Sequence, residues 1–179
     1  MQRDKMRTLT LTALFTALVF VGTYVVKIPL SFGYTHIGDS MIFLAVMVLG
    51  WKRGAAAGAV GAALADLIGG FAVWVAPTLI AKAVMAATLG LVLDRRPFGL
   101  RGRALWLTGA AISAIVHAAL YTLATALIYG GPAAITMLPA ELMQSAVGMA
   151  VAFVLAEALQ KTALAGSFAY TTHGKEPRA

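Results

Sequence analysis

The chain has 179 residues, of which 60% are hydrophobic and 12% are charged, and its mean hydropathy is +0.85. Soluble domains usually carry about 25% charged residues, so this composition excludes a large soluble domain. The sequence has no cysteine, which excludes disulfides, thiolate metal sites and a cysteine nucleophile. The net charge of +7 is compatible with a nucleic-acid partner only if the placement of the charges supports one.

Apolar runs separated by turn residues follow one another along the chain. The first covers residues 9–29; it is too long for a signal peptide, lacks a clear cleavage site and is followed by further runs, so we predict a retained helix. The other runs cover residues 36–49, 55–68, 73–93, 104–129 and 139–159. Six spans of about 20 residues use about 120 residues. The sequence therefore predicts an all-α integral membrane protein with a six-helix domain over residues 1–163. A polar cytoplasmic tail, expected to fray, follows over residues 164–179, and one of the two short runs could be only partly embedded.

Basic residues alternate between the ends of these runs. Twelve of the fourteen fall on one side of the membrane if both termini lie on that side: Arg3, Lys5, Arg7, Lys52, Arg53, Arg95, Arg96, Arg101, Arg103, Lys161, Lys175 and Arg178. The positive-inside rule then places both termini in the cytoplasm. The positive net charge reflects this orientation and the attraction to the anionic inner leaflet, so a nucleic-acid partner is not expected.

Small residues dominate the third run, where Gly54 and Gly58 form a G-x-x-x-G pair. Because lipid competes equally for apolar contacts, helices in membranes associate through small residues. The third helix is therefore expected in the bundle interior. Ala13 and Ala17 in the first run have the same four-residue spacing.

Ionisable residues from five predicted helices fall at similar depths when counted at about 1.5 Å per residue. They occupy the outer half of the membrane: Asp39, Asp66, Lys82, His117 and Glu141. The inner half offers only Glu157, close to the surface. Charged groups inside a membrane are costly and usually mark function. This asymmetry predicts a polar pocket that opens outward.

Each of these residues also has a structural interpretation. Asp39 and Glu141 stand at expected helix amino termini, where caps and the helix dipole favour carboxylates. Lys82 needs a carboxylate or a ligand, since a lone buried ammonium is expensive; Asp66 and Asp39 are both candidates. His117 could be a hydrogen-bonded core residue.

Aromatic residues near the outer ends allow two interpretations. Tyr34 lies beside His36 in the first outer loop and could cover the pocket. Tyr121 could contribute to the pocket or to an interfacial belt, and the belt is favoured for Trp74 and Tyr129.

Enzyme motifs are absent from the sequence, which has no H-E-x-x-H, no G-x-S-x-G and no P-loop lysine. The three histidines are too scattered for a metal cluster, so no catalytic residue, metal or cofactor is predicted. The pattern fits a protein that captures a substrate and needs partners to complete transport.

Four segments carry a family resemblance. They are Tyr-Thr-His-Ile-Gly-Asp-Ser-Met-Ile-Phe-Leu-Ala (34–45), Leu-Gly-Trp-Lys-Arg-Gly (49–54), Ala-Leu-Ala-Asp-Leu-Ile-Gly-Gly (63–70) and Ala-Pro-Thr-Leu-Ile-Ala-Lys (76–82). Together they resemble the substrate-binding S components of energy-coupling factor (ECF) transporters, in the branch of hydroxymethylpyrimidine, pyridoxine and riboflavin-type uptake proteins.

The resemblance implies a six-helix subunit of the prokaryotic plasma membrane that captures a vitamin or precursor in its outer half, under the first loop. It also implies docking onto a membrane coupling subunit that carries two ATPase subunits. Family members dock through small residues on helix one, which Ala13 and Ala17 match.

The resemblance implies where the site lies, but it does not identify which residues bind the ligand. Combined with the polar groups above, the candidate substrate-binding residues are Tyr34, His36, Asp39, Asp66, Lys82, His117, Tyr121 and Glu141. Pyridoxine or hydroxymethylpyrimidine fits better than riboflavin, which needs more aromatic wall. The alternatives are a small membrane enzyme acting through Asp39, Asp66 and His117, and a stand-alone channel.

Overall fold

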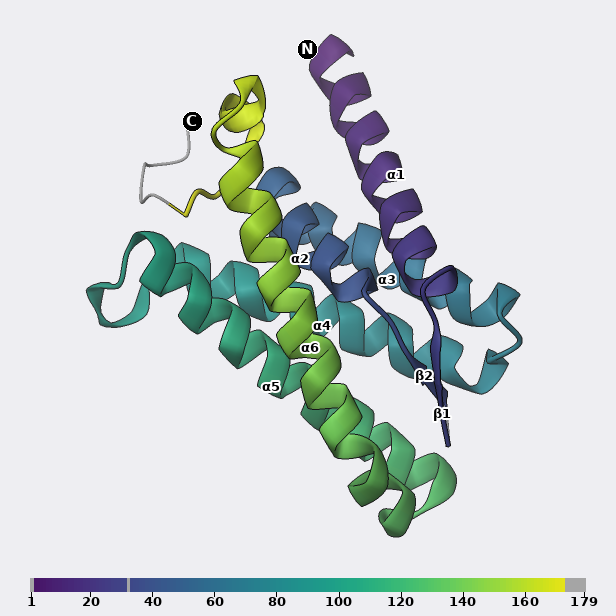
Figure 1. The fold of residues 1–179 in the computed structure, drawn as a ribbon. Helices are drawn as coiled ribbons and strands as arrows, with labels where there is room; N and C mark the ends of the chain where they lie inside the picture. The colour runs from purple at the N-terminus through teal and green to yellow at the C-terminus, as the bar shows by residue number, and fades with distance from the viewer. Residues whose placement is uncertain (1, 32, 173–179) are drawn as a thin grey trace.

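A computed structural model describes residues 2–31 and 33–172 (Figure 1). His173, Lys175 and Arg178 lie outside the described residues. Six α-helices make up most of the described chain: α1 (Gln2–Tyr24), α2 (Gly38–Leu49), α3 (Trp51–Ile68), α4 (Val75–Arg95), α5 (Gly102–Tyr129) and α6 (Gly131–Leu159). The short 3-10 turns η1 (Ala72–Trp74), η2 (Pro97–Gly99) and η3 (Ala163–Ser167) complete the helical structure.

The long helices confirm a helical membrane protein. Four of them, α1, α4 with its preceding turn η1, α5 and α6, are long and apolar enough to cross a membrane. Helix α2 is strongly apolar but has only 12 residues. The fold is therefore helical and multi-pass, while six crossings with both termini inside remain a prediction.

Helix α6 begins at Gly131, so the expected start near Pro139 is wrong. Gly130 has a φ of +90°, a conformation that glycine adopts without strain, and the chain turns there. Pro132 then lies in the first turn, where its missing N–H costs nothing. Pro139 is tolerated inside the helix because neighbouring groups can satisfy a freed carbonyl in a membrane bundle.

A short β-hairpin, which the sequence did not predict, forms part of the connection between α1 and α2. Strands β1 (Ile28–Leu30) and β2 (Gly33–Thr35) pair antiparallel, with Pro29 opposite Tyr34. The hairpin lies near one end of the bundle (Figure 1). The pairing orders a connection that was expected only as a loop, and it fixes the position of Tyr34.

Helix α3 packs against α1, α2 and α4, while apolar side chains on its other face, including Leu64 and Leu67, are exposed. The expected interior position is therefore only partly correct. Its glycines let neighbouring backbones approach closely. A Cβ at Gly54 would lie 2.8 Å from Val46 Cα of α2, and one at Gly61 would lie 2.5 Å from the Thr16 carbonyl oxygen of α1. Larger residues at these positions would push the helices apart.

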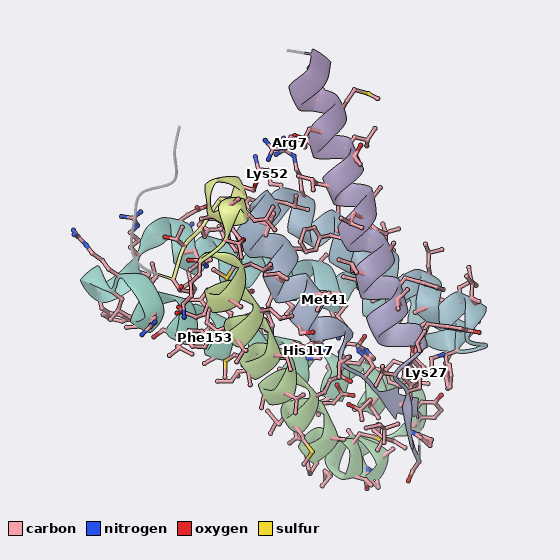
Figure 2. All side chains as sticks on the ribbon, turned by 45° about the horizontal axis from the view of Figure 1, so that its top comes forward. Arg7, Lys27, Met41, Lys52, His117 and Phe153 are labelled. Carbon is pink, nitrogen blue, oxygen red and sulfur yellow. The ribbon has the colours of Figure 1, made fainter. Side chains whose placement is uncertain are left out.

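The largest apolar core lies where α2 meets α4, α5 and α6. Its fully buried members include Phe43, Met85, Leu89 and Trp106. The side chains labelled in Figure 2 show the polarity of the bundle, with Arg7 and Lys52 at one end and Lys27 near the hairpin. We call the first the basic end and the second the hairpin end.

The segment after α6 folds back onto the basic end. The Tyr170 backbone N–H donates to the Met47 carbonyl at 2.9 Å, and the Tyr170 hydroxyl donates to Asp94 at 2.7 Å. The side chains of Phe168 and Thr172 are buried. The expectation of a frayed tail is therefore wrong for residues 164–172, because two aromatic side chains tie the segment to the bundle.

Candidate functional site

Three of the predicted ionisable residues meet directly in the bundle interior. Lys82 Nζ of α4 lies 2.6 Å from Asp39 Oδ1 of α2 and 2.7 Å from His117 Nε2 of α5, and all three side chains are fully buried. A lysine ammonium can only donate hydrogen bonds, so His117 Nε2 accepts. His117 Nδ1 then carries the proton and donates to Ser145 Oγ at 2.9 Å.

This arrangement decides between the two carboxylates that the sequence offered to Lys82. Asp39, and not Asp66, forms the ion pair. Helix α6 packs closely against α2 beside the ion pair because Gly148 has no side chain. A Cβ at Gly148 would lie 2.8 Å from Asp39 Cβ. Asp66 instead accepts a 2.5 Å hydrogen bond from the Tyr34 hydroxyl of the hairpin.

Gln144 of α6 connects the ion pair to the first loop. Its Nε2 donates to Asp39 Oδ2 at 3.1 Å. Its Oε1 accepts from Thr35 Oγ1 at 2.9 Å and from the His36 N–H at 3.2 Å. The sequence analysis missed Gln144, although an uncharged amide inside an apolar run is itself a signal of buried hydrogen bonding.

His36 is held neutral at this junction. Burial lowers its pKa to about 3, and the positive charge of Lys82 acts in the same direction. Its Nδ1 accepts a hydrogen bond from the Gly38 N–H at 3.0 Å. The neutral ring therefore fixes the entry of the chain into α2.

A pocket with a cavity volume of about 30 Å³ lies beside this network. That volume is well below the ~300–1,000 Å³ typical of small-molecule sites, so a ligand requires the lining side chains to move apart. The hairpin, the link from β2 to α2, η1 and four helices contribute its lining residues: Tyr34, His36, Asp66, Trp74, Thr78, Tyr121, Met137, Glu141 and Gln144.

The aromatic wall of the pocket is built by η1 and α5. The Trp74 and Tyr121 rings stack with centroids 5.8 Å apart and an interplanar angle of 21°. The Tyr121 hydroxyl donates to Thr78 Oγ1 at 2.7 Å. Trp74 is 6% exposed, so the favoured interpretation of Trp74 as a belt residue is wrong.

Two buried carboxylate oxygens on the pocket wall have no hydrogen-bond partner among the described residues. They are Asp66 Oδ2 and Glu141 Oε2. Leaving a buried polar atom unsatisfied costs ~1–3 kcal/mol. Both oxygens accept hydrogen bonds when ionised, so the pocket is chemically suited to a molecule that carries N–H or O–H donors.

The predicted site residues thus divide into two sets. Tyr34, His36, Asp66, Tyr121 and Glu141 line the pocket. The other set, Asp39, Lys82 and His117, is packed behind the pocket. Gln144 connects Asp39 to the pocket through a hydrogen bond. The Tyr121 ring connects the other two, because its centroid lies 5.0 Å from Lys82 Nζ and 4.7 Å from the centroid of the His117 ring.

The remaining predictions fall elsewhere. Ala13 and Ala17 are exposed on α1, and Glu157 pairs with Arg103 at 2.6 Å near the basic end. Among the described residues, no group of three metal-ligating side chains is placed to hold an ion.

A multi-pass helical bundle with a polar, aromatic-lined pocket is typical of a membrane protein that binds a small molecule. The family model of the ECF-type riboflavin transporter S component matches residues 3–161. An uncharacterised protein of Pyrococcus woesei, described as lying in a gap 3′ region, is 32% identical over 145 residues, which cover 80% of this chain and 95% of that protein.

The chain therefore belongs to the family of ECF-type riboflavin transporter S components. Membership makes it a substrate-binding transport subunit rather than an enzyme, embedded in a prokaryotic membrane. It also implies a vitamin substrate and partners in an ECF module.

Proposed function

We propose that this S component captures a small heteroaromatic vitamin or vitamin precursor in the pocket between the hairpin and α3–α6. The observation that carries the proposal is the pair of unsatisfied carboxylate oxygens, Asp66 Oδ2 and Glu141 Oε2, on two residues that line one pocket together with the stacked Trp74 and Tyr121 rings. The aromatic wall holds a flat ring, and the carboxylates accept its amine or hydroxyl hydrogens.

Pyridoxine and hydroxymethylpyrimidine match this chemistry because each combines one flat ring with hydroxyl or amine donors. Riboflavin is the second candidate, favoured by the description of the matching family. Its three-ring system is larger, and the pocket offers three aromatic residues, Tyr34, Trp74 and Tyr121.

Calorimetric titration of the purified protein with each of the three compounds tests the substrate class. We expect Asp66→Asn and Glu141→Gln each to weaken binding of the bound compound about tenfold or more, equivalent to ~1–3 kcal/mol. Glu157→Gln, which changes a carboxylate at the basic end, should leave the affinity unchanged. Unchanged affinity in both pocket variants would exclude this pocket as the binding site.

The hairpin end faces outward in this proposal, with six crossings and both termini in the cytoplasm. The basic residues of the opposite end support it through the positive-inside rule. Because the chain has no cysteine, single cysteines can report the topology. Cysteines at Ser31 and Gly131, both exposed, should react with an impermeant thiol reagent on intact cells. Cysteines at Gly99 and Ala165 should react only after lysis, and external labelling of Gly99 would overturn the orientation.

The exposed face of α1 is proposed to dock on the coupling subunit, which carries two ATPase subunits. Ala13 and Ala17 leave a shallow strip between exposed leucines, including Leu14 and Leu18, and small residues allow close helix contacts in membranes. Ala13→Trp should weaken co-purification with the coupling subunit and leave ligand affinity intact. Loss of affinity with intact assembly would assign this face to the binding site.

A further inference from the structure

A second cavity lies at the basic end, far along the chain from the pocket residues. Its lining comes from the start of α1, the corner between α2 and α3, and the segment after α6. Two arginines, Arg7 and Arg53, and the Ser167 hydroxyl provide its polar side, while Leu11, Val48 and Phe168 provide an apolar side. None of the lining residues is acidic.

The polar side is arranged for an anion. Arg7 uses Nη2 to donate to Ser167 Oγ at 2.9 Å, which leaves most of its five N–H donors available. Arg53 is exposed. Guanidinium groups bind phosphate through paired hydrogen bonds, and among the described residues that line the cavity none is a carboxylate that would offset the two positive charges. Lys52 lies at the same end (Figure 2) and adds to this field.

The apolar side and the framework distinguish this cavity from a generic basic surface. Phe168 is buried in the main core, and the hydrogen bond from Tyr170 to the Met47 carbonyl holds the segment after α6 in place. The cavity therefore has a structured wall formed from three separate parts of the chain. Basic pockets between membrane helices at the interface are suited to the headgroups of anionic lipids.

We propose that this cavity binds the phosphate headgroup of an anionic phospholipid. The phosphate lies between Arg7 and Arg53 with the Ser167 hydroxyl beside it, and the first part of an acyl chain follows Leu11 and Val48. Such a lipid would join α1 to the α2–α3 corner and to the segment after α6. The proposal does not depend on the vitamin pocket, which lies at the other end of the bundle.

Native mass spectrometry of the protein released from mixed phosphatidylglycerol and phosphatidylcholine nanodiscs tests the proposal. The wild type should retain phosphatidylglycerol in preference to phosphatidylcholine. Arg53→Gln and the double variant Arg7→Gln/Arg53→Gln should lower the retained fraction at least fivefold. The control Arg95→Gln/Arg96→Gln removes two charges near the same end but outside the cavity, and it should retain the lipid like the wild type.

Several outcomes would overturn the assignment. Equal losses in the cavity and control variants would show that only net charge matters. Inorganic phosphate that displaces phosphatidylglycerol at low millimolar concentration would show a free-anion site in which the apolar wall has no role. Since the structure gives Arg53 no side-chain partner among the described residues, its single variant should stay folded, and an unchanged lipid preference in that variant would also contradict the proposal.

Discussion

The two ends of the bundle are built from the same helices but differ in the side chains that hold these helices together. Near the hairpin, helices α2, α4, α5 and α6 contribute an ion pair, a histidine and an amide in continuous contact. Toward the basic end, the same helices meet through Phe43, Leu89, Trp106 and other apolar side chains. The first region gains specificity from paired polar groups, and the second gains rigidity from close packing.

The polar region should contribute most to the free energy of ligand binding, and the apolar region should contribute most to the free energy of folding. In the polar region, each buried group must find a partner, because an unpaired charge away from water is costly. The ion pair has its partners within the protein, but Asp66 and Glu141 keep one unsatisfied oxygen each at the pocket wall. The apolar region has no such requirement, so a change there should affect stability without affecting the ligand.

The largest expected effect is the loss of one partner of the buried ion pair. Lys82→Met leaves Asp39 charged and unpaired in the interior, which should lower the free energy of unfolding by ~3–5 kcal/mol. Thermal unfolding in detergent measures the change. Replacing both partners, Lys82→Met with Asp39→Leu, should recover much of the stability, because no buried charge is left. A single variant as stable as the wild type would show that the pair is not buried as described.

The next effect belongs to the apolar region. Leu89 is fully buried in the main core, and Leu89→Ala creates a cavity that should cost ~2–4 kcal/mol of stability. Its affinity for the vitamin should stay within twofold of the wild type once the protein is folded. A parallel loss of affinity in calorimetry would mean that the two regions are energetically coupled, against the division drawn here.

A smaller effect is expected where the pocket meets the ion pair. Gln144→Leu removes the bonds to Asp39, Thr35 and His36, so it should weaken ligand binding by ~1–3 kcal/mol. Gln160→Leu is the matched control, since Gln160 Oε1 accepts only from Thr172 among the described bonds, near the basic end. Equal affinities of the two variants would remove Gln144 from the site.

The smallest effect is expected at the ion pair between Arg103 and Glu157 near the basic end. Arg103 is 58% exposed and Glu157 is 13% exposed, and ion pairs that water reaches contribute about 0–1 kcal/mol. Glu157→Gln should therefore shift the thermal midpoint by at most a few degrees, and the shift should shrink further at high salt. A loss comparable to that of Lys82→Met would show that the basic end also depends on a charge pair.

The sequence by itself determined the class of the protein and the region of its polar site. Apolar runs of spanning length and the placement of the lysines and arginines define a membrane bundle, because the bilayer imposes length and polarity on each helix. For the same reason, Asp39, Asp66, Lys82, His117 and Glu141 could be assigned to one depth before any contact was known. The small residues of α3 likewise predicted its close contacts with neighbouring helices.

Only the tertiary structure decided which polar groups meet. Depth along a helix does not give rotation about its axis, so the sequence left both Asp39 and Asp66 as partners for Lys82. The approach of α6 to α2 at Gly148, and the hairpin that carries Tyr34 to Asp66, settle that choice. The burial of Trp74, the bridging role of Gln144 and the packing of Phe168 also follow from contacts between segments distant in the sequence, which periodicity within one helix cannot encode.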